Sequence, residues 1–289
     1  MNKFEYARPE TVAEAVDLLA QFGDDARILA GGTDLVIELR NRWTEPKVVV
    51  DVKRIPEFAP SITEHDGVVS ISAGAVMADV TASDLMHREF PALPEAAVVV
   101  GSVQIRARAT VAGNICNGSP AADTSPPLLV YGAVVVVAGP SGKRRIPIDD
   151  FIVGPGKTAL ERGELVLAIE LPIPGRPSGS AYTRLTRRRG TDLASITLCC
   201  GVDGNGTTRL SYGSVGPRAF LVVDDSGVLA DPSVPIAEKV EPLDRMFYQA
   251  SPSLRSLRAS PDYRLAMLRV LGARALETAI SRMTKELVT

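Results

Sequence analysis

Residues 26–40, ARILAGGTDLVIELR, place a short apolar run, two adjacent glycines and a helical pattern in succession. This order predicts a strand over 26–30, a turn over 31–34 and a helix over 35–40. Glycines let the main chain approach a ligand closely, and the N–H groups at the start of a helix favour an anion such as pyrophosphate. The Thr33 side chain can add a hydroxyl. The stretch is consistent with a diphosphate-binding turn and also with a tight turn that holds no ligand.

A second segment of small and polar residues, TVAGNICNGSPAAD, occupies positions 110–123. Small residues again permit close approach of a backbone, while Thr110, Asn114, Ser119 and Asp123 supply side chains that form hydrogen bonds. A carboxylate in such a loop suits the hydroxyl groups of a ribose or ribityl chain. Taken alone, the segment is equally consistent with a plain loop whose Asn and Asp side chains cap the nearby backbone. Two such segments in one chain favour a nucleotide cofactor.

The residues around these segments predict two α/β lobes and a smaller α+β domain. A capped helix over 9–23 and a strand over 48–52 complete the first lobe, and strands are expected at 68–73, 128–138 and 165–171, with a helix near 81–87. The proline-rich stretch 172–177 marks the best domain boundary. Beyond it, the pattern predicts strands at 181–186, 194–202 and 208–214, a Gly-Asn-Gly turn at 204–206 and a helix over 261–287.

The composition excludes several classes of protein. The chain has 289 residues, of which 45% are hydrophobic and 23% charged, as in an ordinary globular protein. Its net charge of −2 gives no general electrostatic reason to bind nucleic acid or anionic lipid. The N-terminus lacks the apolar core of a signal peptide, and the longest apolar run, 128–138, is too short to span a bilayer. We therefore expect a cytoplasmic protein without a transmembrane segment.

Metal and hydrolase sites are poorly supported by the sequence. The three cysteines contain no C-x-x-C pair and there are two histidines, which argues against a zinc or iron–sulfur site in this chain. Gly156-Lys157-Thr158 resembles the end of a phosphate-binding P-loop, but Phe151 stands where the first glycine of that motif is required. No G-x-S-x-G elbow occurs either. We accordingly expect no metal ligands and no catalytic acid–base pair.

In their order and spacing, residues 29–35, 110–114 and 119–123 resemble the FAD-binding medium subunit of the molybdenum hydroxylases. This family includes the medium subunits of xanthine dehydrogenase and aerobic carbon monoxide dehydrogenase. Further similar features lie at 150–151, 158, 163–165, 171–172, 188–194 and 260–264, so the resemblance covers essentially the whole chain. It implies an α+β fold, with a PCMH/VAO-type FAD-binding domain at 1–176 that is built of two α/β lobes, about 1–56 and 57–176. It also implies the family's C-terminal domain at 177–289, with a three-stranded antiparallel sheet and helices.

The resemblance implies FAD as the cofactor and assigns its contacts. The two glycine-rich loops are expected to hold the pyrophosphate, Asp123 the sugar-like chain, and Arg184 and Leu193 to lie near the flavin ring. Val100 and Val166 match apolar positions that line the pocket. The expected cofactor-binding residues are Ile28, Leu29, Ala30, Gly31, Gly32, Thr33, Asp34, Leu35, Val100, Thr110, Ala112, Gly113, Asn114, Asp123, Val166, Arg184 and Leu193. Ala112 departs from the family, which usually has glycine there, and would be strained if that position required a positive φ.

The function that the resemblance implies is electron transfer within a complex. A small partner subunit with two [2Fe–2S] clusters would deliver electrons from a large molybdopterin subunit, and the flavin chain would pass them to NAD, a quinone or dioxygen. Two other hypotheses remain open at this stage. One is a self-sufficient PCMH-type flavin oxidoreductase, and the other is a non-enzymatic nucleotide-binding scaffold subunit.

Overall fold

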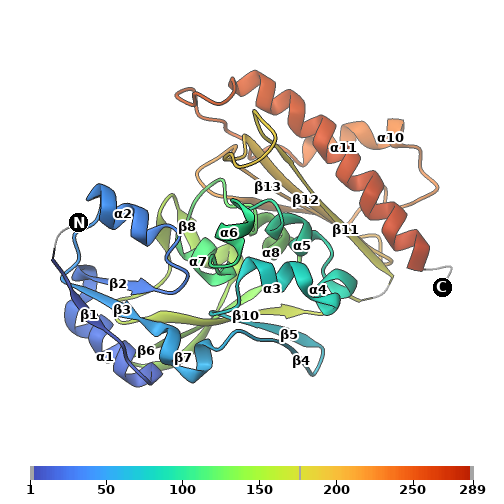
Figure 1. Ribbon diagram of the computed structural model, residues 1–289. Helices are drawn as coiled ribbons and strands as arrows, with labels where there is room; N and C mark the ends of the chain where they lie inside the picture. Colours follow the sequence, from blue (N-terminus) through green and yellow to red (C-terminus); the bar gives the residue numbers. More distant parts are fainter. Residues whose placement is uncertain (1–2, 176, 287–289) are drawn as a thin grey trace.

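The computed structural model describes residues 3–175 and 177–286 and has two lobes beneath a sheet-and-helix domain (Figure 1). The first lobe contains β1 (Glu5–Ala7), α1 (Val12–Phe22), β2 (Ala26–Leu29), α2 (Leu35–Asn41) and β3 (Val48–Asp51). Its strands form a parallel sheet in the order β1-β3-β2. Thr11 caps α1, since its hydroxyl accepts a hydrogen bond from the Glu14 amide at 3.2 Å.

The second lobe is built on a five-stranded antiparallel sheet in the order β4-β5-β10-β6-β7. Its strands are β4 (Ile62–His65), β5 (Val68–Ser72), β6 (Val134–Gly139), β7 (Gly142–Pro147) and β10 (Leu165–Pro172). Six short helices connect β5 to β6: α3 (Met77–Ala82), α4 (Asp84–Glu89), α5 (Ala92–Ala97), α6 (Val103–Arg106), α7 (Val111–Cys116) and α8 (Ser125–Val130). One hydrophobic core joins this lobe to the first. Between β7 and β10 lie α9 (Ile148–Phe151), β8 (Ile152–Gly154) and β9 (Lys157–Thr158).

The C-terminal domain is an antiparallel sheet covered by a long helix. Its strands, in spatial order, are β11 (Ser178–Leu185), β12 (Ile196–Asp203), β13 (Thr208–Gly213) and β14 (Phe220–Asp224). The helices are α10 (Ile236–Arg245) and α11 (Pro261–Glu286), and α11 runs along the outer face of the sheet (Figure 1). A β-carbon at Gly179 would lie 2.1 Å from the Ala279 carbonyl oxygen, so the backbones of β11 and α11 touch because this strand position is glycine.

The C-terminal sheet packs on the second lobe, and this contact is termed the domain interface. Helices α5 and α8 of that lobe pack against β11, β12 and β13. A β-carbon at Gly201 of β12 would approach the Val130 side chain to 2.6 Å, which shows how closely the sheet lies on α8. The opposite face of the sheet packs on α10 and α11 around Leu243, Leu268 and Leu276.

Several sequence expectations need correction. Residues 128–138 are not one strand: α8 ends at Val130, Gly132 turns the chain with a φ of +63°, and β6 begins at Val134. The apolar run does not reveal where the helix ends and the strand begins, because a buried helix and a buried strand are both apolar throughout. The segment at 110–119 contains the short helix α7, and the region near 81–87 holds two helices, α3 and α4. The C-terminal sheet has a fourth strand, β14, where three were expected.

We predict that a carboxylate at the base of the second lobe stabilises the fold above acid pH. Arg144 of β7 donates from Nε and Nη2 to the two carboxylate oxygens of Glu164, at 2.6 and 2.7 Å. These bonds lower the pKa of Glu164 below its ordinary 4.5. The ion pair therefore contributes its full stabilisation of the fold above the ordinary pKa of 4.5. This stabilisation is lost as the pH falls through the lowered pKa.

Glu164→Gln is expected to reduce the free energy of unfolding by about 1 kcal/mol at neutral pH and to flatten its decline in acid. Urea unfolding at a series of pH values measures both effects. Glu161→Gln is the control, since Glu161 is exposed and 4.0 Å from Arg144. An acid dependence that is the same in both variants would contradict the assignment.

Candidate cofactor site

The first glycine-rich loop connects β2 to α2 and presents unpaired main-chain donors. Gly32 has a φ of +76°, a conformation that favours glycine, and its carbonyl accepts a hydrogen bond from the Val36 amide at 3.0 Å. Among the residues that the structure describes, the amides of Gly31 to Asp34 donate to no protein acceptor. These residues are not buried, so the loop offers a row of free N–H groups at the start of a helix.

The first loop lies directly against the residues that precede the second. A β-carbon at Gly31 would sit 2.0 Å from the Arg108 carbonyl oxygen and 3.2 Å from the Ala109 Cα. Only glycine permits this approach, which places the first loop beside Thr110. The two segments singled out in the sequence are therefore neighbours in space, although about eighty residues separate them along the chain.

The second segment begins as a capped helix. The Thr110 hydroxyl accepts a hydrogen bond from the Gly113 amide at 2.9 Å and so caps α7. Ala112 lies inside α7, is 4% exposed and has no positive φ, so its methyl group adds no backbone strain. The Asn114 side-chain oxygen accepts from the Thr124 hydroxyl at 2.6 Å, which ties α7 to the turn that carries Asp123.

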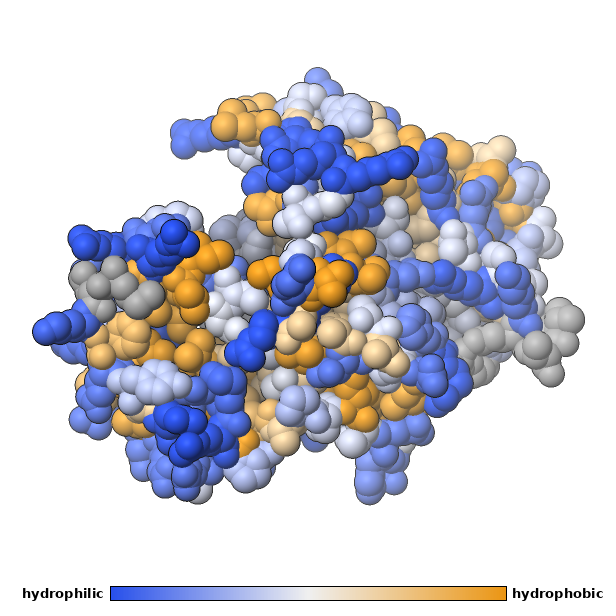
Figure 2. All heavy atoms as spheres, viewed as in Figure 1, coloured by the Kyte–Doolittle hydropathy of each residue, from blue (hydrophilic) through white to orange (hydrophobic). Residues whose placement is uncertain are grey.

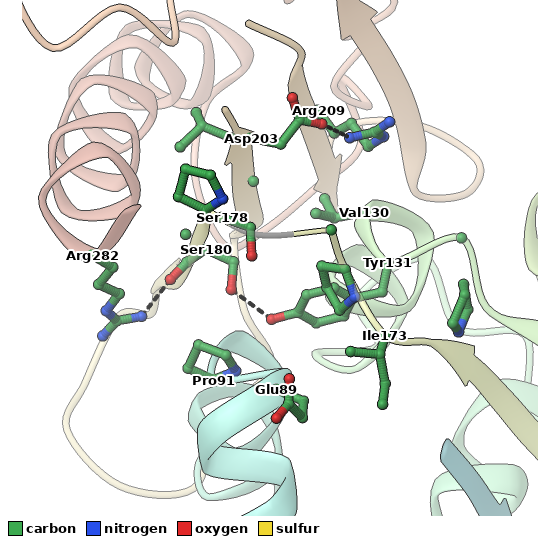
Figure 3. Close-up of a pocket in the computed structure, with 18 of the residues that line it drawn as sticks. Glu89, Pro91, Val130, Tyr131, Ile173, Ser178, Ser180, Asp203, Arg209 and Arg282 are labelled. Carbon is green, nitrogen blue, oxygen red and sulfur yellow. Dashed lines mark hydrogen bonds and ion pairs between the residues drawn. The ribbon is translucent and has the colours of Figure 1, made fainter. Parts of the chain in front are cut away.

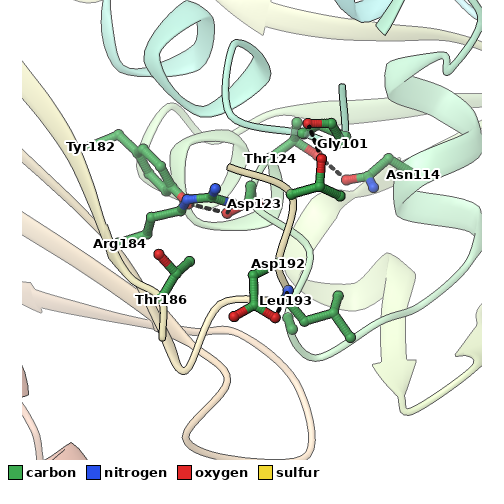
Figure 4. A network of polar contacts seen from close by, with 12 residues as sticks. Gly101, Asn114, Asp123, Thr124, Tyr182, Arg184, Thr186, Asp192 and Leu193 are labelled. Carbon is green, nitrogen blue, oxygen red and sulfur yellow. Dashed lines mark hydrogen bonds and ion pairs between the residues drawn. The ribbon is translucent and has the colours of Figure 1, made fainter. Parts of the chain in front are cut away.

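Asp123 is held by residues of the other domain (Figure 4). Asp123 is 9% exposed, and its carboxylate accepts a hydrogen bond from the Tyr182 hydroxyl at 2.6 Å. Each carboxylate oxygen also lies 3.3 Å from Arg184 Nη1. Burial raises the pKa of Asp123, while the hydrogen bonds and charge of Tyr182 and Arg184 oppose that rise. Because both partners belong to β11, the site is completed across the domain interface.

The loop between β11 and β12 is fastened beside Val100. The Thr191 hydroxyl donates to the Gly101 carbonyl at 3.2 Å. Asp192 accepts from the Leu193 amide at 3.0 Å (Figure 4) and also pairs with Arg187. Leu193 is 51% exposed. The structure thus brings position 193 to the neighbourhood of position 100, as a shared pocket requires.

In the part of the chain that the structure describes, some of the expected residues form no side-chain hydrogen bond or ion pair with the loops around Gly31 and Asp123. Val166 lies in β10 opposite Val137, 5% exposed and within the first hydrophobic core. Ile28 and Leu29 end β2, and Leu35 begins α2 as a buried residue. Asp34 is exposed, and partial desolvation of its carboxyl group raises its pKa. For these residues, as for every other expected residue of the site, contact with FAD stays a prediction.

Sequence reasoning missed Tyr182, although a signal was present. Tyr182 and Arg184 are two residues apart on one strand, so their side chains share a face of the sheet. If the Arg184 side chain faces the site, the alternation of side chains along the strand means that the Tyr182 side chain faces it too.

The surface near the loops is hollowed and partly apolar. Figure 2 shows apolar residues on both sides of a hollow between the regions of α2 and α6. Exposed apolar side chains on these two helices are Val36, Ile37 and Val103. A flat aromatic ring system finds suitable contacts in such surroundings.

A separate cavity of about 910 Å³ lies at the domain interface (Figure 3). None of the expected cofactor residues lines it. Arg209 pairs there with Asp203 at 3.0 Å, and Arg282 pairs with Glu95, so these charges are already neutralised. The candidate cofactor site is therefore the group of loops around Gly31 and Asp123.

The family described as "FAD binding domain in molybdopterin dehydrogenase" matches residues 2–174. The chain belongs to this family. FAD is accordingly its cofactor, and the chain is a component of an oxidoreductase. The match ends two residues before the domain boundary that we expected at 176. No helix in the described residues has the length and apolar character needed to cross a membrane.

Two relatives align over nearly their whole length. The carbon monoxide dehydrogenase medium chain of Hydrogenophaga pseudoflava is 32% identical over 297 residues, which cover 97% of this chain and 98% of the relative. The xanthine dehydrogenase FAD-binding subunit of Escherichia coli O157:H7 is 30% identical over 281 residues, with 96% of each chain covered.

Solved structures agree with the fold. A chain of reconstituted CO dehydrogenase from Oligotropha carboxidovorans superposes with a TM-score of 0.87 at 29% identity, covering 97% of this chain and 99% of that one. A chain of quinoline 2-oxidoreductase from Pseudomonas putida 86 gives 0.86 at 25% identity, with 97% and 98% covered. The expected α+β fold with a PCMH-type FAD domain is confirmed.

We predict that Gly31→Ala empties the cofactor site. The added methyl group would collide with the Arg108 carbonyl and push the two loops apart. The FAD content of the purified chain, measured by flavin absorbance against protein, is expected to fall well below one per chain. Gly154→Ala is the matched control, because a β-carbon there meets nothing within 4 Å. A Gly31→Ala chain with full flavin occupancy would refute the role of this contact.

Proposed function

We propose that this chain is the electron-transfer flavoprotein subunit of a molybdenum hydroxylase complex. It takes electrons from the [2Fe–2S] clusters of a small partner subunit and passes them to a terminal acceptor such as NAD or a quinone. The observation that carries the proposal is the backbone contact at Gly31, because it brings the free amides of the first loop against the residues that lead into α7. The near-complete coverage of relatives named as medium and FAD-binding subunits supports it.

The residues of the site fit FAD by their chemistry. Free amides at Gly31 to Asp34 suit the negative charges of a diphosphate, and the start of α7 adds its helix dipole. The Asp123 carboxylate accepts hydrogen bonds from hydroxyl groups, which suits the ribityl chain. Leu193, Val100 and Arg184 would surround the ring system.

FAD, when bound, supplies a centre that accepts electrons singly and releases them in pairs. The side chains of the protein then need only bind, orient and shield the cofactor, and none has to act as an acid or base. This role agrees with the site, where Asp123, Tyr182 and Arg184 are engaged with one another.

The partners that we propose are a small [2Fe–2S] subunit and a large molybdopterin subunit. Purification of the tagged full chain from its native cells is expected to recover both, with iron and molybdenum in the preparation. Flavin reduction by the substrate of the complex should require these partners. NAD, a quinone and dioxygen, offered separately to the reduced complex, identify the acceptor.

The rival functions give different results in the same experiment. A chain that turns over a substrate without partners would be a self-sufficient flavin oxidoreductase. A chain that binds no FAD, alone or in its complex, would be a scaffold subunit and would refute the proposal.

We further predict that Asp123→Asn acts through loss of the cofactor. The amide cannot accept as many hydrogen bonds from hydroxyls, so FAD affinity is expected to fall about tenfold. Activity per bound flavin should stay close to that of the unaltered complex, measured at saturating FAD. Lost activity with full flavin occupancy would instead indicate a direct chemical role for Asp123.

A further inference from the structure

We propose that Tyr182 is a positioning residue through which the C-terminal domain sets the affinity of the chain for FAD. It does so by orienting the Asp123 carboxylate, and the inference rests on the proposed function of the site. Tyr182 belongs to β11, outside the family match at residues 2–174, so the cofactor site of the first domain would depend on a side chain of the second.

Tyr182 is anchored to the FAD-binding domain at both of its polar ends. Its amide donates to Glu95 Oε2 at 2.9 Å, and its hydroxyl donates to Asp123 Oδ1 at 2.6 Å. Glu95 is in turn paired with Arg282 of α11. The backbone of β11 is also fixed by its register, in which Tyr182 lies opposite Cys199. The hydroxyl therefore has a fixed position from which to hold the carboxylate.

The contacts of Asp123 are divided unequally between its two oxygens. Oδ1 accepts from both Tyr182 and Arg184, whereas Oδ2 has only the 3.3 Å contact with Arg184 Nη1. Each carboxylate oxygen can accept about two hydrogen bonds, so Oδ2 retains capacity for a hydroxyl donor. This arrangement leaves one oxygen of a largely buried carboxylate available to a polyol chain.

Arg184 explains why the tyrosine is needed. A guanidinium group prefers a bidentate pairing with both oxygens of a carboxylate at shorter distances than 3.3 Å. Without the Tyr182 hydroxyl, the Asp123 carboxylate would be free to rotate into that bidentate pairing. It would then have less hydrogen-bonding capacity left for a cofactor. Burial and the neighbouring Asp123 raise the pKa of Tyr182, so its hydroxyl keeps the proton that it donates.

The chain contains a matched tyrosine at the same interface. The Tyr131 hydroxyl lies 2.5 Å from Ser180 Oγ and accepts from the Ala92 amide at 3.1 Å (Figure 3). It also connects the FAD-binding domain to β11, two residues before Tyr182, and it has no contact with Asp123. Tyr131→Phe therefore removes a buried hydroxyl from the domain interface without touching the carboxylate.

The test is a titration of the full-length apo chain with FAD, followed by flavin fluorescence. Tyr182→Phe is expected to raise the dissociation constant about tenfold, since a hydrogen bond to a charged group is lost. Tyr131→Phe is expected to leave it within twofold of the unaltered chain, even where thermal unfolding shows a similar loss of stability. The phenylalanine ring fills the same space in both variants.

A double-mutant cycle with Asp123→Asn separates positioning from general loosening. If Tyr182 acts through Asp123, adding Tyr182→Phe to Asp123→Asn changes the dissociation constant by less than twofold. Three results would overturn the inference: an unchanged constant in Tyr182→Phe, an equal loss in Tyr131→Phe, or an additive loss in the double variant. An unaltered chain that binds no FAD would instead refute the proposed function itself.

Discussion

The contact between Gly31 and the Arg108 carbonyl determines the geometry of the candidate site. A side chain at position 31 would force the two main chains apart, since even one methyl group has no room. The first lobe contributes a loop with free amides, and the second contributes the start of α7. Neither loop alone is distinctive, because many strand–helix turns contain glycine. Their contact makes one site of them and also draws together two lobes that share a single core.

The C-terminal domain joins this site through one face of one strand. Ser180, Tyr182 and Arg184 are spaced two residues apart in β11, and all three side chains contact the FAD-binding domain. Their partners are Tyr131 and Asp123, which flank α8 on either side. The opposite faces of β11 and its neighbours pack on α11. The strand therefore carries polar contacts on one face and an apolar core on the other, which fixes how the domains sit together.

The sequence was informative where a pattern is local. The helix at 261–286 and the strand–turn–helix at 26–41 have the periodicities and turn residues that decide their form. Helix α7 has six residues, too few for a period, and its Gly and Asn content is typical of a loop. The break in 128–138 depended on one glycine with positive φ. The link from Asp123 to Tyr182 spans 59 residues and depends on strand register and domain packing, which no local pattern contains.

The alternation in β11 limits how this protein can vary. Residues on a strand change face with every step along the chain, so one residue inserted or deleted within β11 would turn the polar side chains on one side of the change toward α11. A single substitution at Ser180, Tyr182 or Arg184 would remove only the contacts of that side chain. A shift in the alternation along the strand would instead turn polar side chains toward the apolar core. The linker before the strand can therefore change in composition more freely than β11 can change in length.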